Sequence, residues 1–220
     1  YLLLSSLDIS RRNLALNGEA IFEKVKRFSR YAREEINEIG DYYAYSKELI
    51  NGDSVFDFDE TKLSVNTLEI GLAGIEVYDI LRDRYDIQIE FGDLGNILAY
   101  LSVGDKTKNI ERLISALSDI RRLDKRPRAG MFEASYISPD VAATPQAAFY
   151  ANKRSLPLRA CVGEISTEFV MSYPPGIPIL APGERVTADI VAYIEYAKAK
   201  GCVMTGPEHM DLSKLNVMEV

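Results

Sequence analysis

One carboxylate in this sequence stands where a side chain can reach a ligand. Glu90 lies in the run Ile87–Phe91, whose alternating apolar residues predict a strand with Gln88 and Glu90 on the same face. The strand leads into residues 92–95, whose glycines predict a hairpin. A partly desolvated carboxylate at such a place can bind an ammonium group, or a guanidinium group through two hydrogen bonds. The pattern alone favours a solvated carboxylate at the rim of the sheet, because Glu is mostly exposed in proteins.

A second candidate is Tyr173, which precedes a segment rich in proline. Each proline fixes φ near about −65° and pushes the residue before it into extended geometry, so we expect a stiff loop between a strand and a helix. Such a loop can hold an aromatic ring at the mouth of a pocket, although Tyr before Pro-Pro is also common as a packing residue. Glu168 and Glu184 flank the loop. Glu184 is expected just ahead of a helix, where negative charge stabilises the N-terminus.

The remaining polar candidates give weaker signals. His209 has Glu208 and Asp211 as neighbours, yet a lone histidine in a polar turn is usually solvated. Gly71 and Gly74 do not predict a phosphate-binding loop, because neither a Gly-x-Gly-x-x-Gly pattern nor a Lys-Ser/Thr pair follows them.

The composition is typical of a globular protein with an acidic surface. The 220 residues carry a formal net charge of −7 and a pI near 4.9, which argues against nucleic acid or an anionic membrane as a partner. The basic run 121–128 is interpreted as a helix end and linker rather than a phosphate-binding patch. No apolar run reaches the roughly 20 residues of a membrane helix. Cys161 and Cys202 lie far apart without neighbouring ligands, which favours reduced thiols in a cytoplasmic protein and no metal site.

The spacing of apolar residues predicts an alternation of helices and strands that is typical of an α+β fold. Before residue 128 we expect a long helix through Ile21–Ile39 that Gly40 ends, a strand at Lys62–Asn66, a helix through Leu72–Leu81, strands at Ile87–Phe91 and Asn96–Ser102, and a helix containing Ile110–Ile120. After about residue 130 we expect a helix that begins at Thr144-Pro145 and reaches about Lys153, a strand at Leu158–Val162, the proline-rich loop, a helix over Thr187–Lys200 that Gly201 ends, and an edge strand at Leu215–Val220.

The segment 162–184 has a distinctive amino-acid sequence. It contains Val-Gly-Glu-Ile-Ser-Thr-Glu, then Tyr-Pro-Pro-Gly-Ile-Pro, then Pro-Gly-Glu. It resembles the carboxy-terminal domain of the bacterial ornithine/lysine/arginine decarboxylases, which are pyridoxal-phosphate enzymes of the aspartate aminotransferase fold. Residues 1–8, 59–63 and 89–98 resemble that family in the same order, so the resemblance spans the whole chain. It is strongest to Gram-positive-type arginine decarboxylases, and Glu164 departs from it where the family often has a basic residue.

The resemblance implies a fold of the α+β or α/β class with three parts. Residues 1–50 would be the helical end of the large domain that binds pyridoxal phosphate, 51–128 a small α+β domain of the same transferase fold, and 129–220 the decarboxylase carboxy-terminal domain. Family members carry their cofactor lysine upstream of the stretch that matches Tyr1. We therefore expect pyridoxal phosphate to be bound mainly upstream of Tyr1, with no catalytic or cofactor-binding residue here. The abrupt start at Tyr1 predicts a fragment of a longer polypeptide that is inactive alone.

The resemblance also implies a substrate and partners. The family's counterpart of Glu90 binds the distal cationic end of an amino-acid substrate, and Tyr173 is a second substrate-binding candidate. Arginine is the favoured substrate, followed by lysine or ornithine, in a polyamine pathway. The expected partners are the amino-terminal portion of the same enzyme and a second copy, in a homodimer or larger homo-oligomer. Ser5 and Ser6 follow the place where relatives contact the cofactor phosphate across the dimer interface.

Two alternatives to a decarboxylase remain open. The first is a non-catalytic interaction or regulatory module that keeps the fold. The second is an aminotransferase of the same superfamily. Those enzymes typically hold the substrate α-carboxylate with an arginine late in the small domain, and no arginine here stands in a recognisable context of that kind.

Overall fold

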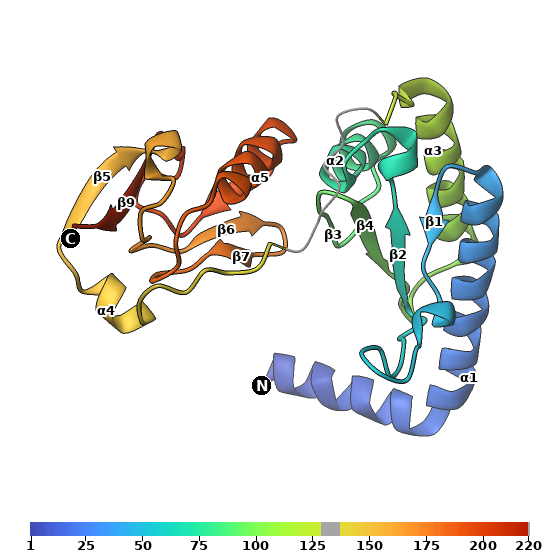
Figure 1. Cartoon of the computed structure of the whole chain (residues 1–220). Helices are drawn as coiled ribbons and strands as arrows, with labels where there is room; N and C mark the ends of the chain where they lie inside the picture. Colours follow the sequence, from blue (N-terminus) through green and yellow to red (C-terminus); the bar gives the residue numbers. More distant parts are fainter. Residues whose placement is uncertain (129–136, 220) are drawn as a thin grey trace. The chain divides into compact units, whose positions relative to one another are not determined.

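The computed structural model describes residues 1–128 and 137–219, and the chain divides into two compact units (Figure 1). The first unit comprises Tyr1–Glu90 and Gly95–Arg128, and the second comprises Phe91–Leu94 and Ala129–Val220. Each unit is described by itself below. The expected division into three parts, at residues 50 and 128, stays a prediction. No helix in the described part of the chain combines the length and the apolar composition needed to cross a membrane.

The first unit is built on β1, β2 and β4, which are neighbours in that order in a sheet whose fourth strand is β3. Burial alternates along β2 and β4, and the inward residues Leu63 and Val65 lie directly opposite Ala99 and Ile97. The three helices contribute apolar residues to the same core. The elements up to residue 124 are α1 (Leu2–Ile39), β1 (Tyr43–Ala44), a 3₁₀ turn η1 (Lys47–Leu49), β2 (Lys62–Asn66), a 3₁₀ turn η2 (Leu68–Ile70), α2 (Gly74–Tyr85), β3 (Phe91–Gly92), β4 (Asn96–Tyr100) and α3 (Thr107–Asp124), and of these only β3 lies outside the first unit.

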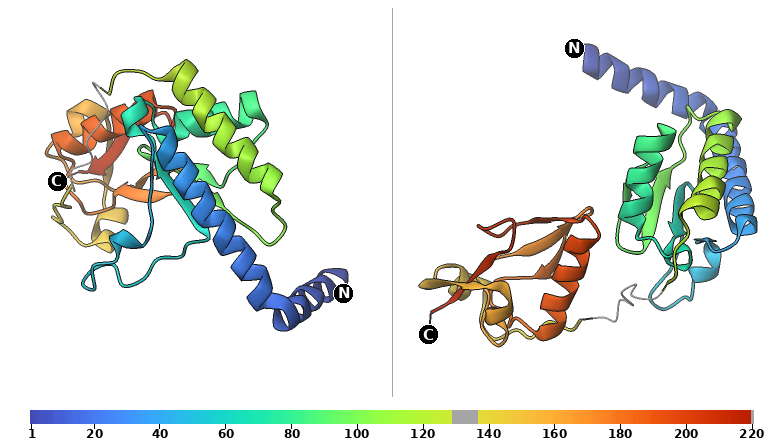
Figure 2. Two further views of the ribbon diagram at one scale, coloured as in Figure 1. Left: turned by 90° about the vertical axis from the view of Figure 1, so that its right-hand side faces the viewer. Right: turned by 90° about the horizontal axis from the view of Figure 1, so that it is seen from above.

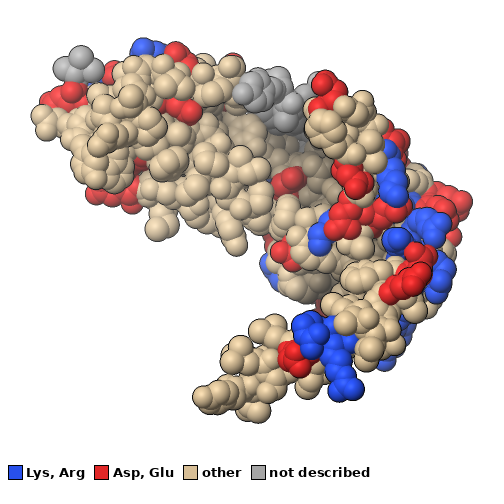
Figure 3. All heavy atoms as spheres, turned by 90° about the horizontal axis from the view of Figure 1, so that it is seen from below, with Lys and Arg blue, Asp and Glu red and all other residues tan. Residues whose placement is uncertain are grey.

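The amino-terminal part of α1 is exposed in the first unit. Residues 1–17 are all exposed, and the first buried residue of the helix is Val25. Figure 2 shows this dark blue segment extending away from the sheet in both views. On the face drawn in Figure 3, acidic and basic side chains lie next to one another over the helical unit, so neither sign forms a continuous field there.

Several sequence predictions for this unit are confirmed. The strand at Lys62–Asn66 has the expected bounds, Gly40 ends α1, and α3 carries the expected apolar face. The strand expected at Ile87–Phe91 is wrong in extent, because only Phe91–Gly92 forms a ladder. The physical reason is the end of α2: Asp86 is left-handed at φ 53, and the Ile87 amide donates to the Leu81 carbonyl. The helix expected to include Leu72 begins at Gly74.

A buried arginine joins α1 to the sheet. Arg33 is 5% exposed, and its guanidinium donates to main-chain carbonyl oxygens. Nε donates to Tyr45 (2.7 Å), Nη2 to Lys62 (2.7 Å), and Nη1 to Glu60 (2.9 Å) and Ser29 (3.2 Å). Burial lowers the pKa of this guanidinium from its ordinary value. The guanidinium therefore fixes three separate chain segments around β2.

Replacing Arg33 with Met should destabilise the first unit by roughly 3 kcal/mol or more, because buried carbonyls lose a charged donor. The measurement is the free energy of unfolding in a denaturant titration. Arg27→Met, an exposed substitution on the same helix, serves as the control and should change little. Equal stability of the two variants would contradict the role given to Arg33.

The second unit contains two small sheets, ordered β5-β9 and β7-β6-β8. Helix α5 buries Ile190, Val191, Ile194 and Ala197 and lies beside β7 (Figure 1). The elements are α4 (Pro145–Phe149), β5 (Lys153–Pro157), a 3₁₀ turn η3 (Leu158–Cys161), β6 (Val170–Tyr173), β7 (Ile177–Leu180), α5 (Ala188–Ala199), β8 (Val203–Thr205) and β9 (Lys214–Met218).

Both predicted helix starts in this unit are confirmed. The hydroxyls of Thr144 and Thr187 accept hydrogen bonds from backbone amides three residues later, each at 3.2 Å. Helix α4 ends at Phe149, before the expected Lys153, because β5 begins there. The strand expected at Leu158–Val162 is wrong, since Leu158–Cys161 forms a 3₁₀ turn. Its apolar residues reach the core from that turn, which an apolar run alone does not distinguish from a strand.

The proline-rich segment is a hairpin rather than a loop. Strands β6 and β7 are antiparallel and are joined by Pro174-Pro175-Gly176, with Gly176 at φ 96. The Gly176 amide donates to the Ser172 carbonyl at 2.8 Å and closes the turn. Strand β7 lies at the edge of its sheet, where Pro178 is tolerated because one side of the strand needs no ladder donors.

Asn216 on β9 is the polar centre of the second unit. It is 4% exposed, and its side-chain amide donates to Glu168 Oε1 (2.9 Å) and Glu208 Oε2 (2.8 Å). The Asn216 backbone amide donates to Glu168 Oε2 at 3.0 Å, and the Thr167 hydroxyl donates to the Asn216 carbonyl at 3.0 Å. Ser155 completes the set by donating to the side-chain oxygen. This network ties β9 to β5 and to the residues that lead into β6.

Asn216→Asp should destabilise the second unit by about 2–3 kcal/mol at neutral pH, because a third carboxylate replaces the donor between two others. Crowding raises the pKa of the new carboxyl in the folded state above its unfolded value. The loss should therefore shrink as the pH falls below neutrality and grow as it rises. Unfolding measured between pH 4 and 7 checks this, with the exposed Asn152→Asp as control. A pH-independent loss would contradict the explanation.

Candidate functional site

Glu90 lies at a bend immediately before β3, and its side chain is exposed. Its backbone amide donates to the Leu98 carbonyl on β4 at 3.0 Å, which fixes the residue at the edge of the sheet. Among the residues that the structure describes, its carboxylate has no hydrogen bond or ion pair with another side chain. The predicted position at the rim is therefore correct, although the residue precedes the strand instead of lying in it.

The carboxylate borders a cavity of about 470 Å³ within the first unit. Segment 86–90, β4 and α3 form its walls. The floor is apolar and buried, and the rim is polar. The floor residues are Ile89, Ala99, Leu101, Ile110 and Leu113, and the rim residues are Asp86, Gln88, Glu90, Tyr100, Asp105, Asn109 and Arg112.

Asp105 is the rim carboxylate with internal partners. Its Oδ2 accepts from the Ser102 amide at 2.7 Å, and its Oδ1 accepts from the Asn109 side chain at 3.1 Å. Burial raises the pKa of the Asp105 carboxyl, but the hydrogen bonds from Ser102 and Asn109 outweigh it and hold the pKa below 3.8. Tyr100 is occupied in a different way, because Lys62 Nζ lies 3.8 Å from the centre of its ring. Glu90 is thus available to a cation where Asp105 is already engaged.

Tyr173 lies in the second unit, at the end of β6 opposite Val203. Its ring is 56% exposed. Glu90 belongs to the first unit, so the two candidates lie in different units. The substrate-binding role of either residue stays a prediction.

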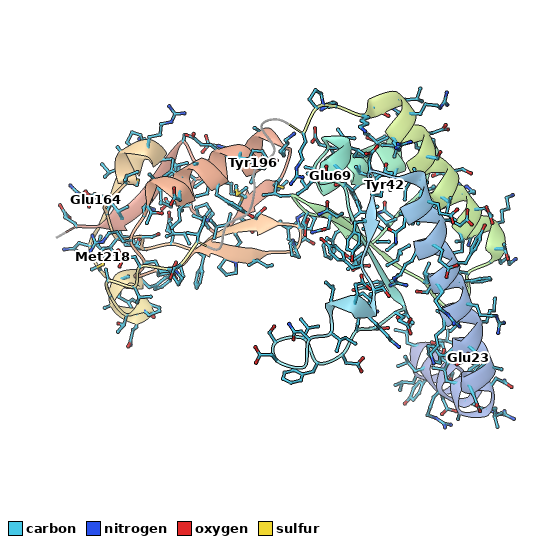
Figure 4. All side chains as sticks on the ribbon, turned by 45° about the vertical axis from the view of Figure 1, so that its right-hand side comes forward. Glu23, Tyr42, Glu69, Glu164, Tyr196 and Met218 are labelled. Carbon is cyan, nitrogen blue, oxygen red and sulfur yellow. The ribbon has the colours of Figure 1, made fainter. Side chains whose placement is uncertain are left out.

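The other acidic candidates have structural partners. Glu168 belongs to the Asn216 network, and Glu164 forms an ion pair with Arg154 Nη2 at 2.7 Å, near Met218 (Figure 4). Glu184 lies ahead of α5 as expected, but its carboxylate accepts from the Ala181 amide at 2.9 Å and closes its own turn. His209 is half-buried in a polar turn, where its carbonyl accepts from the Leu212 amide.

The sequence did not indicate which other polar residues line the cavity beside Glu90. Asp105, Asn109 and Arg112 lie at the start of α3, well separated from Glu90 in the chain. The one local signal was Gly104-Asp105 ahead of a predicted helix, which is typical of a turn and a helix start. Nothing local indicates that this helix start lies opposite residues 86–90.

Comparison with known proteins decides the family. Residues 127–208 match the family described as the Orn/Lys/Arg decarboxylase, C-terminal domain. An arginine decarboxylase of Halalkalibacterium halodurans is 37% identical over 225 aligned residues, which cover 100% of this chain and 45% of the relative. An arginine decarboxylase of Bacillus subtilis is 35% identical over 222 aligned residues, with the same shares covered. The chain matches the carboxy-terminal portion of the Orn/Lys/Arg decarboxylase family.

This match confirms the family that the motifs indicated. The chain spans about half the length of these curated relatives, at 45% of each. The fold agrees with that of a solved lysine decarboxylase, the constitutive enzyme of E. coli. The TM-score is 0.68 at 14% identity, with 100% of this chain and 43% of the other covered. The mixed α+β class is thereby confirmed. The names of the curated relatives do not favour the alternative of a non-catalytic module.

The decarboxylase family implies pyridoxal phosphate as a cofactor, and the environments of the lysines indicate whether the described residues can hold it. A pyridoxal-phosphate site needs a lysine for the Schiff base and a partner for the pyridine nitrogen. Every lysine of the chain lies in the described part, and none is buried. Lys24 donates to the Asp105 carbonyl, and Lys125 pairs with Asp41. The described residues do not by themselves fit a pyridoxal-phosphate site.

The lowered pKa of Asp105 predicts a dependence of stability on pH. A carboxyl whose folded pKa lies below its unfolded value stabilises the fold above the unfolded pKa, and that contribution is lost as the pH falls through the folded pKa. Asp105→Asn should therefore reduce the loss of stability between pH 6 and about pH 3. Denaturant unfolding at both pH values checks it. Asp53→Asn, an exposed control, should keep the wild-type slope, and a wild-type slope in Asp105→Asn would contradict the prediction.

Proposed function

We propose that this chain supplies the substrate-end carboxylate and the carboxy-terminal domain of a decarboxylase of basic amino acids. Arginine is the favoured substrate, because the relatives that cover the whole chain are named arginine decarboxylases. Lysine and ornithine come next. The enzyme would act in the cytoplasm, in a polyamine pathway.

The observation that carries the substrate assignment is the free carboxylate of Glu90 above an apolar floor. A basic amino acid has an aliphatic stem and a cationic end. The stem can lie on Ile89 and Leu113, and the cation can reach Glu90 without displacing an internal ion pair. A hydrogen bond between ionised groups is stronger than one between neutral groups, so the carboxylate selects for the charge. Glu90 is the residue to which we assign this recognition, and Tyr173 is the second candidate.

We infer that pyridoxal phosphate is the cofactor and that it is held by the part of the relatives that this chain does not span. Two features support this. The relatives are more than twice as long as the aligned region, and no lysine here is buried. The 220 residues alone should therefore release no CO₂ from arginine, lysine or ornithine, and should give no aldimine absorbance with pyridoxal phosphate.

The exposed apolar start of α1 supports an assembly. Leu2 is 88% exposed, Leu3 81% and Leu16 71%, an arrangement that water disfavours and that a partner surface would cover. We infer that this segment packs against the remaining part of the enzyme in a homodimer or larger homo-oligomer. Sedimentation of the active enzyme as a monomer would contradict this.

A hybrid enzyme tests the proposed function. The part of the Bacillus subtilis arginine decarboxylase that aligns with this chain is replaced by the 220 residues. The truncated relative alone is the control. Formation of agmatine from arginine by the hybrid, and none by the truncated relative, is the expected result. A folded hybrid that binds the cofactor but stays inactive would overturn the proposal.

In this hybrid, Glu90→Gln keeps the shape but removes the charge that binds the distal cation. It should cost on the order of 1.5–3 kcal/mol of transition-state stabilisation, or roughly ten- to a hundredfold in kcat/KM for arginine. The melting temperature should stay near that of the parent, because the side chain is exposed. Glu34→Gln, an exposed glutamate of α1, is the matched control and should leave kcat/KM unchanged. Full activity of Glu90→Gln would show that Glu90 is only a solvated carboxylate at the rim of the sheet.

A further inference from the structure

Arg112 of α3 binds the place where α2 ends. Its Nη2 donates to the carbonyl of Tyr85 at 3.0 Å and to that of Asp86 at 3.2 Å. These carbonyls belong to the last residue of α2 and to its left-handed cap, so they lack partners within the helix. A cation at this end also counters the negative end of the helix dipole. Arg112 therefore fixes the start of segment 86–90.

The segment that carries Glu90 has further anchors beyond its start, but residues 86–89 are held without a ladder. Residues 86–89 form no ladder with a strand. The Ile87 amide donates to the Leu81 carbonyl at 3.0 Å, and the Gln88 side chain donates to the Tyr78 hydroxyl at 2.7 Å. At the far end, the Glu90 amide donates to the Leu98 carbonyl at 3.0 Å, Ile89 is buried in the core, and β3 begins at Phe91. The sheet and the core thus hold the far end of the segment, and Arg112 holds its start.

Arg112 and Glu90 border the same cavity, and Arg112 also borders a neighbouring cavity of about 320 Å³. No ion pair joins the two side chains in the described part of the chain. The guanidinium binds main-chain carbonyls instead, which leaves the carboxylate free for a ligand.

We propose that Arg112 is the positioning residue of Glu90: by holding the Tyr85 and Asp86 carbonyls, it keeps the Glu90 carboxylate directed at the cavity. The consequence for substrate recognition rests on the proposed function, whereas the consequence for the segment does not. A simple helix cap would stabilise α2 but would show no specific link to Glu90. The two experiments below separate these roles.

The first experiment measures amide hydrogen exchange in the 220-residue chain. In Arg112→Met, the amides of Ile87 and Glu90 should exchange about tenfold faster or more, while Val65 on β2 stays protected. Arg122→Met is the matched control, because its exposed partner Asp119 lies on the same helix. Wild-type exchange at Glu90, or a uniform increase that includes Val65, would overturn the proposal. If Arg112→Met does not fold, the same amide exchange rates are measured in Arg112→Lys. This variant keeps the positive charge but lacks the planar guanidinium that binds both carbonyls.

The second experiment is a double-mutant cycle in the hybrid enzyme. Arg112→Met should lower kcat/KM for arginine about tenfold in the parent but cause no further loss in Glu90→Gln. Losses that multiply would show that Arg112 acts on something other than Glu90, and would overturn the proposal. A fully active Glu90→Gln would instead refute the substrate role of Glu90 and with it the catalytic effect of Arg112. An inactive hybrid would refute the proposed function alone, because hydrogen exchange still decides whether Arg112 positions the segment.

Discussion

The first unit depends on one buried cation that has carbonyls for partners. Desolvating a guanidinium is costly, and the cost is offset only when its donors are satisfied with good geometry. Arg33 meets this requirement by binding oxygens from α1, from the residue after β1 and from the turn into β2. The three segments must keep these positions together, or the guanidinium is left buried without partners. The constraint extends to the sheet, because Arg33 binds the Lys62 carbonyl at the start of β2 and β2 pairs directly with β4.

From β4 the constraint reaches the candidate site. Leu98 receives the amide of Glu90, and Ala99 and Leu101 form part of the cavity floor. The hydrogen bond to β4 thus fixes the backbone of Glu90, and residues of α3 form the opposite wall of the cavity. The charges are distributed unevenly across this cavity. Asp105 is used to hold its own turn and Arg112 to hold the end of α2, whereas Glu90 and Asp86 have no side-chain partner among the described residues, and Glu90 is the one to which we assign recognition. Such a division between structural and available charges is what a binding site requires.

The sequence predicted the elements whose signals are local. Gly40 as a helix stop, Thr144 and Thr187 as caps, and the alternation over Lys62–Asn66 each depend on neighbours along the chain. The failures lie where tertiary packing decides. Leu158–Cys161 is apolar like a strand but turns, and residues 87–89 alternate like a strand but form no ladder. In the same way, Glu90 was recognised through its motif, whereas Asp105, Asn109 and Arg112 became neighbours only through folding.

In the proposed function, Glu90 recognises a positive charge at the end of an amino-acid side chain. Citrulline has nearly the shape of arginine but a neutral end. A comparison of the two ligands therefore measures the effect of the charge alone. The most direct measurement is inhibition of the hybrid enzyme by citrulline, compared with the apparent affinity for arginine, in the parent and in Glu90→Gln. The account predicts that the preference for arginine over citrulline falls about tenfold or more in Glu90→Gln. An unchanged preference would contradict it.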